Sequence, residues 1–219
     1  MSSSHSSSDS SSETSGHAGG GSGAGTTGTD SSAGTGSSAG TTGTGTASDW
    51  ELRLAAAWAE LDSYESDPAG FRARIAELAA ERPADDPVAL FEQGAAHDST
   101  GEPEQAVRLY RRALDGGLTG LRRRRAVIQL ASSLRNLGRP DVSVELLTEE
   151  RAIPADRLDA DETALTSAVD AFLALALADT GRDREAASLA LGALAPLLPR
   201  YNRSLAFYAK DLLKTRQGS

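Results

Sequence analysis

The segment from Leu90 to Leu118, LFEQGAAHDSTGEPEQAVRLYRRALDGGL, most restricts what this chain can fold into. It predicts two short helices that turn back on each other at Gly101, because a glycine just past one helix and a proline opening the next are typical helix boundaries. Small residues, Gly94 in the first helix and Ala106 and Ala113 in the second, lie where the helices must approach closely. The segment therefore predicts an antiparallel helical hairpin.

Two later glycines, Gly138 and Gly181, follow segments with the same pattern. The steps between hinge glycines are 37 residues (138 - 101) and 43 residues (181 - 138), and an irregular insert over 148–160 accounts for the longer step. One such hairpin cannot bury its apolar face alone, so neighbouring hairpins must stack into a continuous core. Because no segment alternates apolar and polar residues as strands do, the predicted fold class is all-α.

Residues 1–47 differ from the rest of the chain. They contain no Leu, Ile, Val, Phe, Tyr or Trp, and they hold 12 of the 22 glycines beside long Ser and Thr runs. Such a segment buries too little apolar surface to offset the entropy lost on ordering. We therefore predict a disordered tail over 1–47 and a helical domain over 48–219, whose first helix starts at a capping box from Ser48 to Glu51.

Helix start and stop signals divide the predicted domain into pairs. We expect an N-terminal helix pair over 48–82, three repeat hairpins, and a capping helix over 199–215. The hairpins cover residues 86–117, 119–147 and 161–198. Terminal elements must close both ends of such a stack. Closure falls to Trp50, Trp58 and Phe71 at one end and to Tyr201, Leu205, Tyr208, Leu212 and Leu213 at the other.

The hairpins resemble the tetratricopeptide repeat family. The family's large and small positions are matched by Leu90, Gly94, Ala106, Tyr110 and Ala113 in the first copy, by Val127, Leu130, Ala131, Leu134 and Leu147 in the second, and by Leu173, Ala174, Leu177, Ala186 and Ala193 in the third. Gln93, His97 and Asp170 depart from the pattern. The resemblance covers roughly 85–198 and leaves the first helix pair outside.

The hairpins rich in Arg and Ala, with the insert, look similar to the bacterial group 5 subfamily. The family resemblance implies a right-handed superhelical stack of antiparallel helix pairs, a TPR-like α-solenoid.

Catalytic and metal-binding patterns are scarce. His97 is the one histidine outside the predicted tail, and there is no cysteine, so no histidine cluster or Cys–His site can be built. His97 falls on a helix-packing position, and the tail's glycine run lacks the strand and helix of a phosphate loop. We expect no enzyme activity, no cofactor and no metal.

The chain has a net charge of -9, which argues against binding nucleic acid or an anionic membrane surface. The first residues, MSSSHSSSDS, show no export signal, and the most apolar run is too short to span a bilayer. We therefore expect a cytoplasmic protein.

Four consecutive arginines, from Arg122 to Arg125, are the sharpest charge feature. On a helix they point all the way round, so they cannot form one patch. The favoured interpretation is a solvated face that pairs with nearby acids such as Glu102 and Glu104. Binding of an acidic peptide by some of these arginines is the alternative.

The family resemblance implies a binding surface on the concave side, lined by the first helix of each pair. The candidate partner-binding residues are Phe91, Arg125, Gln129, Ser132, Arg135, Asn136 and Phe172. Some family members clamp the carboxylates of a peptide terminus with Lys, Asn and Arg. The matching positions here carry Phe91, Ala95, Gln129, Ala168 and Phe172, so we do not expect binding of chaperone tails. Cover by an adjacent helix is as good an interpretation of Phe172 and Leu175 as ligand contact.

Our leading hypothesis is therefore a non-catalytic scaffold that binds a protein or peptide partner in its concave groove. The alternative is a homo-oligomeric structural protein that uses the groove as its own interface. An enzyme or a nucleic-acid regulator is a weaker third hypothesis. The sequence leaves the partner and the oligomeric state open.

Overall fold

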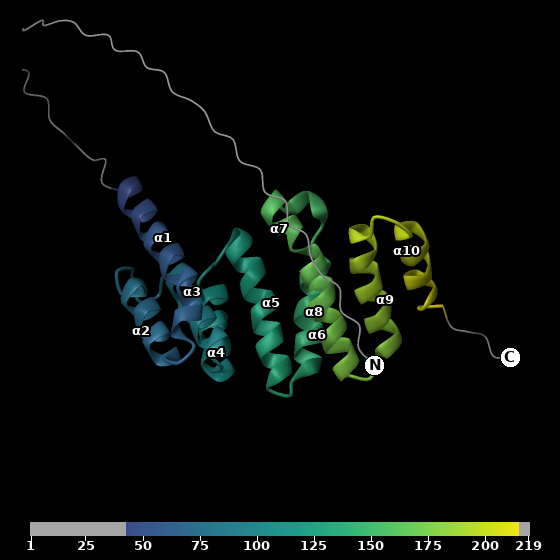
Figure 1. Ribbon diagram of the computed structural model, residues 1–219, viewed down its shortest axis with the longest axis horizontal. Helices are drawn as coiled ribbons and strands as arrows, with labels where there is room; N and C mark the ends of the chain where they lie inside the picture. Colours follow the sequence, from purple (N-terminus) through teal and green to yellow (C-terminus); the bar gives the residue numbers. More distant parts are fainter. Residues whose placement is uncertain (1–42, 215–219) are drawn as a thin grey trace, which may run out of the picture. The chain divides into compact units, whose positions relative to one another are not determined.

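The computed structural model describes residues 43–214, with side chains from Asp49 onward. Most of the predicted disordered tail, residues 1–42, lies outside the described residues. Residues 43–214 form helices and short 3-10 turns without any strand, which confirms the all-α prediction (Figure 1).

The helices follow one another along the chain with short connections. They are α1 (Gly43–Ala59), α2 (Pro68–Ala79), α3 (Pro87–Ser99), α4 (Pro103–Asp115), α5 (Gly120–Asn136), α6 (Pro140–Arg151), α7 (Ala160–Ala164), α8 (Thr166–Asp179), α9 (Asp183–Leu194) and α10 (Asn202–Asp211). Three 3-10 turns complete the fold: η1 (Leu61–Tyr64), η2 (Ala155–Arg157) and η3 (Ala195–Leu197).

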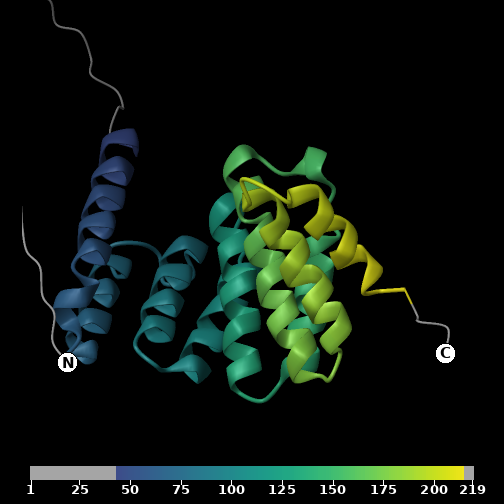
Figure 2. The ribbon, with the colours of Figure 1, turned by 45° about the vertical axis from the view of Figure 1, so that its right-hand side comes forward.

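The helices pack as successive hairpins. α3 pairs with α4, α5 with α6, and α8 with α9, while α5 also contacts both α3 and α8. Figures 1 and 2 show these pairs following each other from α2 to α10. The prediction of a TPR-like α-solenoid is confirmed. α1 packs mainly on α2, and α10 mainly on α9, so these two are the terminal helices of the stack.

Local signals in the sequence set most helix boundaries. Asp86 accepts a hydrogen bond from the backbone N–H of Ala89 at 2.9 Å, and Pro87 occupies the first helical position. The three hinge glycines all adopt left-handed backbone angles, with φ of 81° at Gly101, 74° at Gly138 and 75° at Gly181. Side chains with a Cβ are strained in this conformation, so glycine is the residue that ends these helices.

Two predicted boundaries are wrong. α1 begins at Gly43, so Ser48 lies inside the helix and cannot be its N-cap. α6 continues to Arg151, well into the predicted insert. Its extension has a packing reason, because Glu150 near its end is buried.

Three connected apolar clusters form the core. They lie between α1, α2 and α3, between α3, α4 and α5, and between α5, α6, α8 and α9. Trp50 closes the first end as predicted: it is 3% exposed, and its indole N–H donates to the Leu78 carbonyl at 2.7 Å. At the other end the prediction is wrong for Tyr201, Tyr208 and Leu213, which are exposed, whereas Leu205 and Leu212 are half-buried.

Candidate functional site

Helix α5 carries most of the predicted partner-binding residues. Its buried stripe, which includes Val127, Leu130 and Leu134, faces the core. Arg125, Gln129, Ser132 and Asn136 lie on the other side, spaced three or four residues apart, and so share one face. Because α5 contacts both α3 and α8, this face lies between two neighbouring helices.

Phe91 does not belong to the exposed part of this face. Its side chain is completely buried, with its ring 6.0 Å from the ring of Tyr110. The exposed Arg125 places its guanidinium carbon 5.3 Å from the centre of the Phe91 ring. Phe91 therefore supports Arg125 by a cation–π contact and is a core residue that faces no solvent.

Gln129 and Ser132 are half-buried on α5. The Gln129 side-chain oxygen is buried and accepts no hydrogen bond from any described residue. A buried acceptor without a donor costs free energy, roughly 1–3 kcal/mol. Because the oxygen itself is closed to solvent, it offers a ligand no hydrogen bond in this arrangement.

Arg135 is tied to its surroundings. Its Nε lies 2.7 Å from an oxygen of Asp179 on α8, within ion-pair distance although the contact is too bent for a hydrogen bond. Its Nη1 donates to the side-chain oxygen of the exposed Asn136 at 3.3 Å. Arg135 therefore links α5 to α8 at one end of the face, while Asn136 remains accessible.

Helix α8 forms the neighbouring wall. Phe172 is half-buried and packs against the core cluster of α5, α6, α8 and α9. Leu175 is 46% exposed, and Ala171 is exposed as well. For Phe172 and Leu175 the sequence allowed two interpretations, cover by an adjacent helix or contact with a ligand. Phe172 is largely covered, whereas Leu175 is open to solvent. We call the exposed surface of Arg125, Gln129, Ser132, Asn136, Ala171 and Leu175 the inner face.

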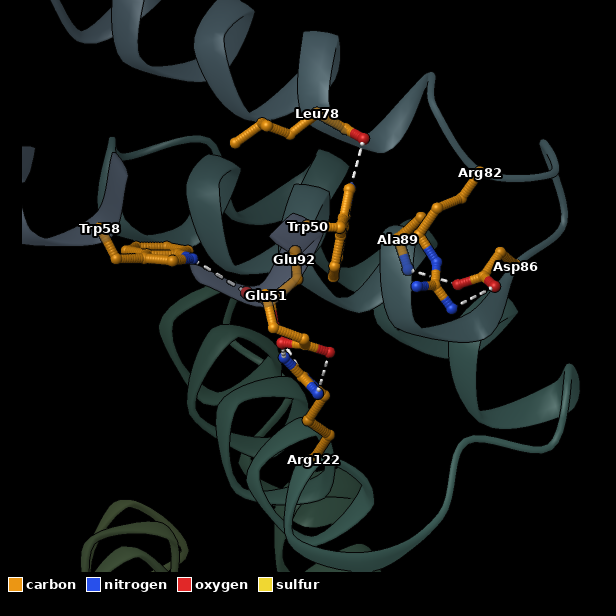
Figure 3. Close-up of polar contacts among 9 residues, drawn as sticks. All are labelled: Trp50, Glu51, Trp58, Leu78, Arg82, Asp86, Ala89, Glu92 and Arg122. Atoms are coloured by element: carbon orange, nitrogen blue, oxygen red, sulfur yellow. Dashed lines mark hydrogen bonds and ion pairs between the residues drawn. The ribbon is translucent and has the colours of Figure 1, made fainter. Parts of the chain in front are cut away.

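Arg122 joins three helices. It donates to both oxygens of Glu51 on α1, at 3.1 and 2.6 Å, and to Glu92 on α3 at 2.8 Å (Figure 3). The indole N–H of Trp58 donates to the other oxygen of Glu92 at 2.9 Å. Burial opposes the charge of Arg122, but the hydrogen bonds to both carboxylates raise its pKa. This network docks α1 on α3 and α5.

Arg123 and Arg124 share one carboxylate. Arg123 donates to Glu150 at 2.8 Å, and Arg124 donates to the other oxygen of Glu150 at 3.0 Å. The predicted pairing with acids is confirmed, but the acids are Glu51, Glu92 and Glu150, and Arg124 is buried, so the predicted solvated face is wrong for it. Arg125 alone of the four has no acidic partner among residues 49–214.

Glu92 and Glu150 are residues that the sequence pattern does not single out. Glu102, a predicted partner of the arginine run, instead bonds Arg72 and His97. The position of Glu92 and Glu150 in their helices is the signal that could have identified them. Each occupies a place on the buried side where an apolar residue such as leucine is expected. A carboxylate there needs a buried cation, and the arginine run supplies one.

The model of the tetratrico peptide repeat family matches residues 87–212. That is 126 residues (212 - 87 + 1) of 219, more than half of the chain. The chain belongs to the tetratricopeptide repeat family. No significant match was found among curated proteins or among solved structures.

The tetratricopeptide match begins at Pro87, the first residue of α3. It leaves α1 and α2 outside, as the sequence resemblance did, but it extends through α10, beyond the predicted limit at 198. Domains of this family are repeat scaffolds that generally take part in protein–protein interaction. The chain is therefore a helical-repeat scaffold. It has a further helix pair, α1 and α2, which the hydrogen bonds of Arg122 help to attach to the repeats.

His97 and Glu102 connect the two helices of the first hairpin. The Nδ1 atom of the half-buried His97 lies 2.8 Å from a Glu102 oxygen, across the turn that joins α3 and α4. Among the described residues, no three His, Cys, Asp or Glu side chains gather as metal ligands would. None of the described helices has the length and apolar character needed to cross a membrane.

Proposed function

We propose that the inner face binds a segment of a protein partner and that the chain acts without catalysis, in the cytoplasm. The observation that carries the proposal is Arg125, an exposed cation with no acidic partner among the described residues, on a helix that packs against α8 with its exposed Leu175. A peptide would supply an acidic group to Arg125 and an apolar side chain to Leu175.

The chemistry of the inner face favours a peptide with one acidic and one apolar anchor. A charge-assisted contact to Arg125 gives direction, because the guanidinium is held over the Phe91 ring. Leu175 supplies apolar area that is already open to solvent. Arg135 contributes less, because it is paired with Asp179. Phe172 would act mainly by supporting this wall.

A random-peptide display library screened against the full chain tests the proposal. We expect the enriched peptides to share an acidic residue and an apolar residue at fixed spacing. Binding of one such peptide, measured by fluorescence anisotropy, should weaken at least about tenfold in Arg125→Glu and in Leu175→Glu, as for central interface residues.

Arg111 on α4 provides the matched control, because it is an exposed arginine away from the inner face. Arg111→Glu changes the net charge as Arg125→Glu does, and it should leave the affinity within about twofold. Equal losses in both arginine variants would mean that the peptide reads only the overall charge, and the inner-face proposal would then be abandoned.

A further inference from the structure

The last helices of the stack expose an unusual amount of apolar surface. Among the described residues, eight large hydrophobic side chains are exposed, and six of them lie between Leu194 at the end of α9 and Leu213 just after α10. They are Leu194, Leu197, Tyr201, Phe207, Tyr208 and Leu213. Terminal repeats normally turn a polar face to solvent, since no further repeat covers them. We call this surface the C-terminal end.

Three aromatic residues dominate the C-terminal end. Tyr201, Phe207 and Tyr208 are 77%, 60% and 63% exposed. A fully exposed aromatic residue offers roughly 150–250 Å², so together they expose on the order of 400 Å². Apolar surface of this extent on a monomer usually marks an interaction site. In a stable interface each partner buries roughly 800 Å², and the three aromatic residues supply about half of that area.

Positive charge surrounds these side chains. Arg200, Arg203, Lys210 and Lys214 are exposed, against the single acid Asp211. Asp211 pairs with Lys214 at 2.9 Å, and the other three cations form no ion pair within the described range. The C-terminal end therefore combines aromatic surface with three uncompensated positive charges, which suits an acidic partner carrying apolar side chains.

The opposite end of the stack has the complementary chemistry. Leu52 is 69% exposed on α1, on the side away from the buried Trp50 and Leu54. The most exposed charged residues between 49 and 82 are acids: Asp49, Glu60, Asp62, Glu65, Asp67, Glu77 and Glu81. The same stretch has four arginines that are partly buried and are each neutralised by an ion pair with an acid, namely Arg53, Arg72, Arg74 and Arg82. We call this surface the N-terminal end. Four of its acids, Glu60, Asp62, Glu65 and Asp67, have no cationic partner in the part of the chain that the structure describes.

We propose that the C-terminal end of one copy docks on the N-terminal end of a second copy, so that the helix stack continues from chain to chain. The contact buries the aromatic residues of α10 against α1 and α2 and sets cations against acids. It is a head-to-tail contact, which leaves a free end of each kind on every dimer.

Other occupants fit the same surface less well. A symmetric contact between two C-terminal ends would bring like charges together, and such contacts are disfavoured. An anionic lipid surface would meet the basic residues of α10, but the chain carries a net charge of -9, which repels it from such a surface. The acidic, leucine-bearing N-terminal end of a second copy satisfies both the charge and the apolar area.

Two full-length variants with one blocked end each test the proposal. Leu52→Arg blocks the N-terminal end, because it sets a cation against the cations of α10, and the pair Phe207→Glu with Tyr208→Glu blocks the C-terminal end. All three positions are exposed, so folding should be kept, as thermal melts would verify. In sedimentation velocity, the parent should form larger species as its concentration rises. Each variant alone should be monomeric.

An equimolar mixture of the two variants gives the decisive result. Each contributes one intact end, so the mixture should form a dimer that cannot grow further. Raised salt should weaken this dimer, because opposite charges face each other across the contact. Leu175→Glu, on the inner face, should associate as the parent does, which separates this proposal from the proposed peptide site.

Several outcomes would overturn the proposal. A parent that stays monomeric at every concentration excludes the contact. Self-association that survives in Leu52→Arg indicates a symmetric contact between C-terminal ends. Loss of self-association in Leu175→Glu assigns the interface to the inner face. The parent could also be monomeric and sediment with phosphatidylserine vesicles. If the Phe207→Glu, Tyr208→Glu variant no longer does so, the C-terminal end binds lipid.

Discussion

Arg124 and Glu150 form an ion pair that is almost completely removed from solvent. The Arg124 Nη1 lies 3.0 Å from a Glu150 oxygen, and the two side chains are 2% and 1% exposed. The pair joins α5 to the end of α6. The second carboxylate oxygen of Glu150 lies 2.8 Å from Arg123, so one acid pairs with two consecutive arginines. The Arg124 Nε is buried without a hydrogen-bond partner among the described residues.

We expect Glu150→Ala to lower the free energy of unfolding by about 3–5 kcal/mol, because it leaves the Arg124 charge buried and unpaired. The double variant Arg124→Met, Glu150→Leu should recover most of that loss, since it removes both charges together. Urea denaturation followed by circular dichroism measures both effects. Glu149→Ala, an exposed neighbour, should change stability by less than about 0.5 kcal/mol. A double variant less stable than Glu150→Ala would contradict this account.

The two carboxylates around Arg122 should differ in their contributions. Glu92 is 4% exposed and receives both Arg122 and the Trp58 indole, whereas Glu51 is 43% exposed. Glu92→Ala should lower the free energy of unfolding by about 1–3 kcal/mol, because it strands buried donors. Glu51→Ala should cost less than about 1 kcal/mol, as for a solvent-screened pair. Thermal melts of the two variants, compared at one pH and salt concentration, check this order.

Two helix glycines should respond in opposite ways to the same substitution. A Cβ on Gly94 would lie 2.9 Å from two ring carbons of Tyr110, which is fully buried and cannot move away. Gly94→Ala should therefore destabilise the fold by about 1–3 kcal/mol through overpacking. A Cβ on Gly192, inside α9, would meet nothing within 4 Å, so Gly192→Ala should stabilise by about 0.4–1 kcal/mol. If Gly94→Ala and Gly192→Ala both melt at the temperature of the parent, the close packing of α3 on α4 at Gly94 is contradicted.

Asp98 should make stability depend on pH. Burial raises the pKa of this carboxyl above its ordinary value of 3.8, and the hydrogen bonds from Ser133 and Tyr110 offset only part of the effect. As the pH rises from 3.8 through the raised pKa, the unfolded chain loses its proton first. The free energy of unfolding contributed by Asp98 therefore falls over this interval.

Asp98→Asn should lack this fall in stability. Urea midpoints of the parent and of Asp98→Asn, measured from below 3.8 to neutral pH, give the difference attributable to this group. Asp86, Glu81 and Glu185 have lowered pKa values and act in the opposite sense, but both proteins carry them, so their effects cancel. A difference that is independent of pH would show that Asp98 does not titrate in this range.

The helical hairpins were predictable because the chain marks them locally. Gly101, Gly138 and Gly181 each end a helix in the left-handed conformation, and Asp67 and Asp86 each cap the helix that follows. These signals depend on a few neighbouring residues. They can be recognised without knowing what packs against the helix.

The polar interior and the exposed aromatic end were not predictable in the same way. A helical pattern assigns charged residues to solvent, yet Arg124 is buried because Glu150, which lies 26 residues away, meets it. The same pattern assigns Tyr208 to the core, yet α10 buries only its Ala209 side. Phe91 falls on the expected inward face, but Arg125 from the next inner helix covers it. Each case depends on a neighbour that spacing alone does not identify.

The chain of contacts from Trp58 through Glu92 to Arg122 and Glu51 bears on how this protein can be divided. A fragment cut at the limits of the family match, 87–212, would keep Glu92 and Arg122 but lose the two α1 side chains that bond them. It would also uncover the apolar side of α3, where Ala96 meets Phe71 and Ile75 in one cluster. The boundary of homology and the boundary of the folding unit thus fall at different residues, and expression trials should begin upstream of α1.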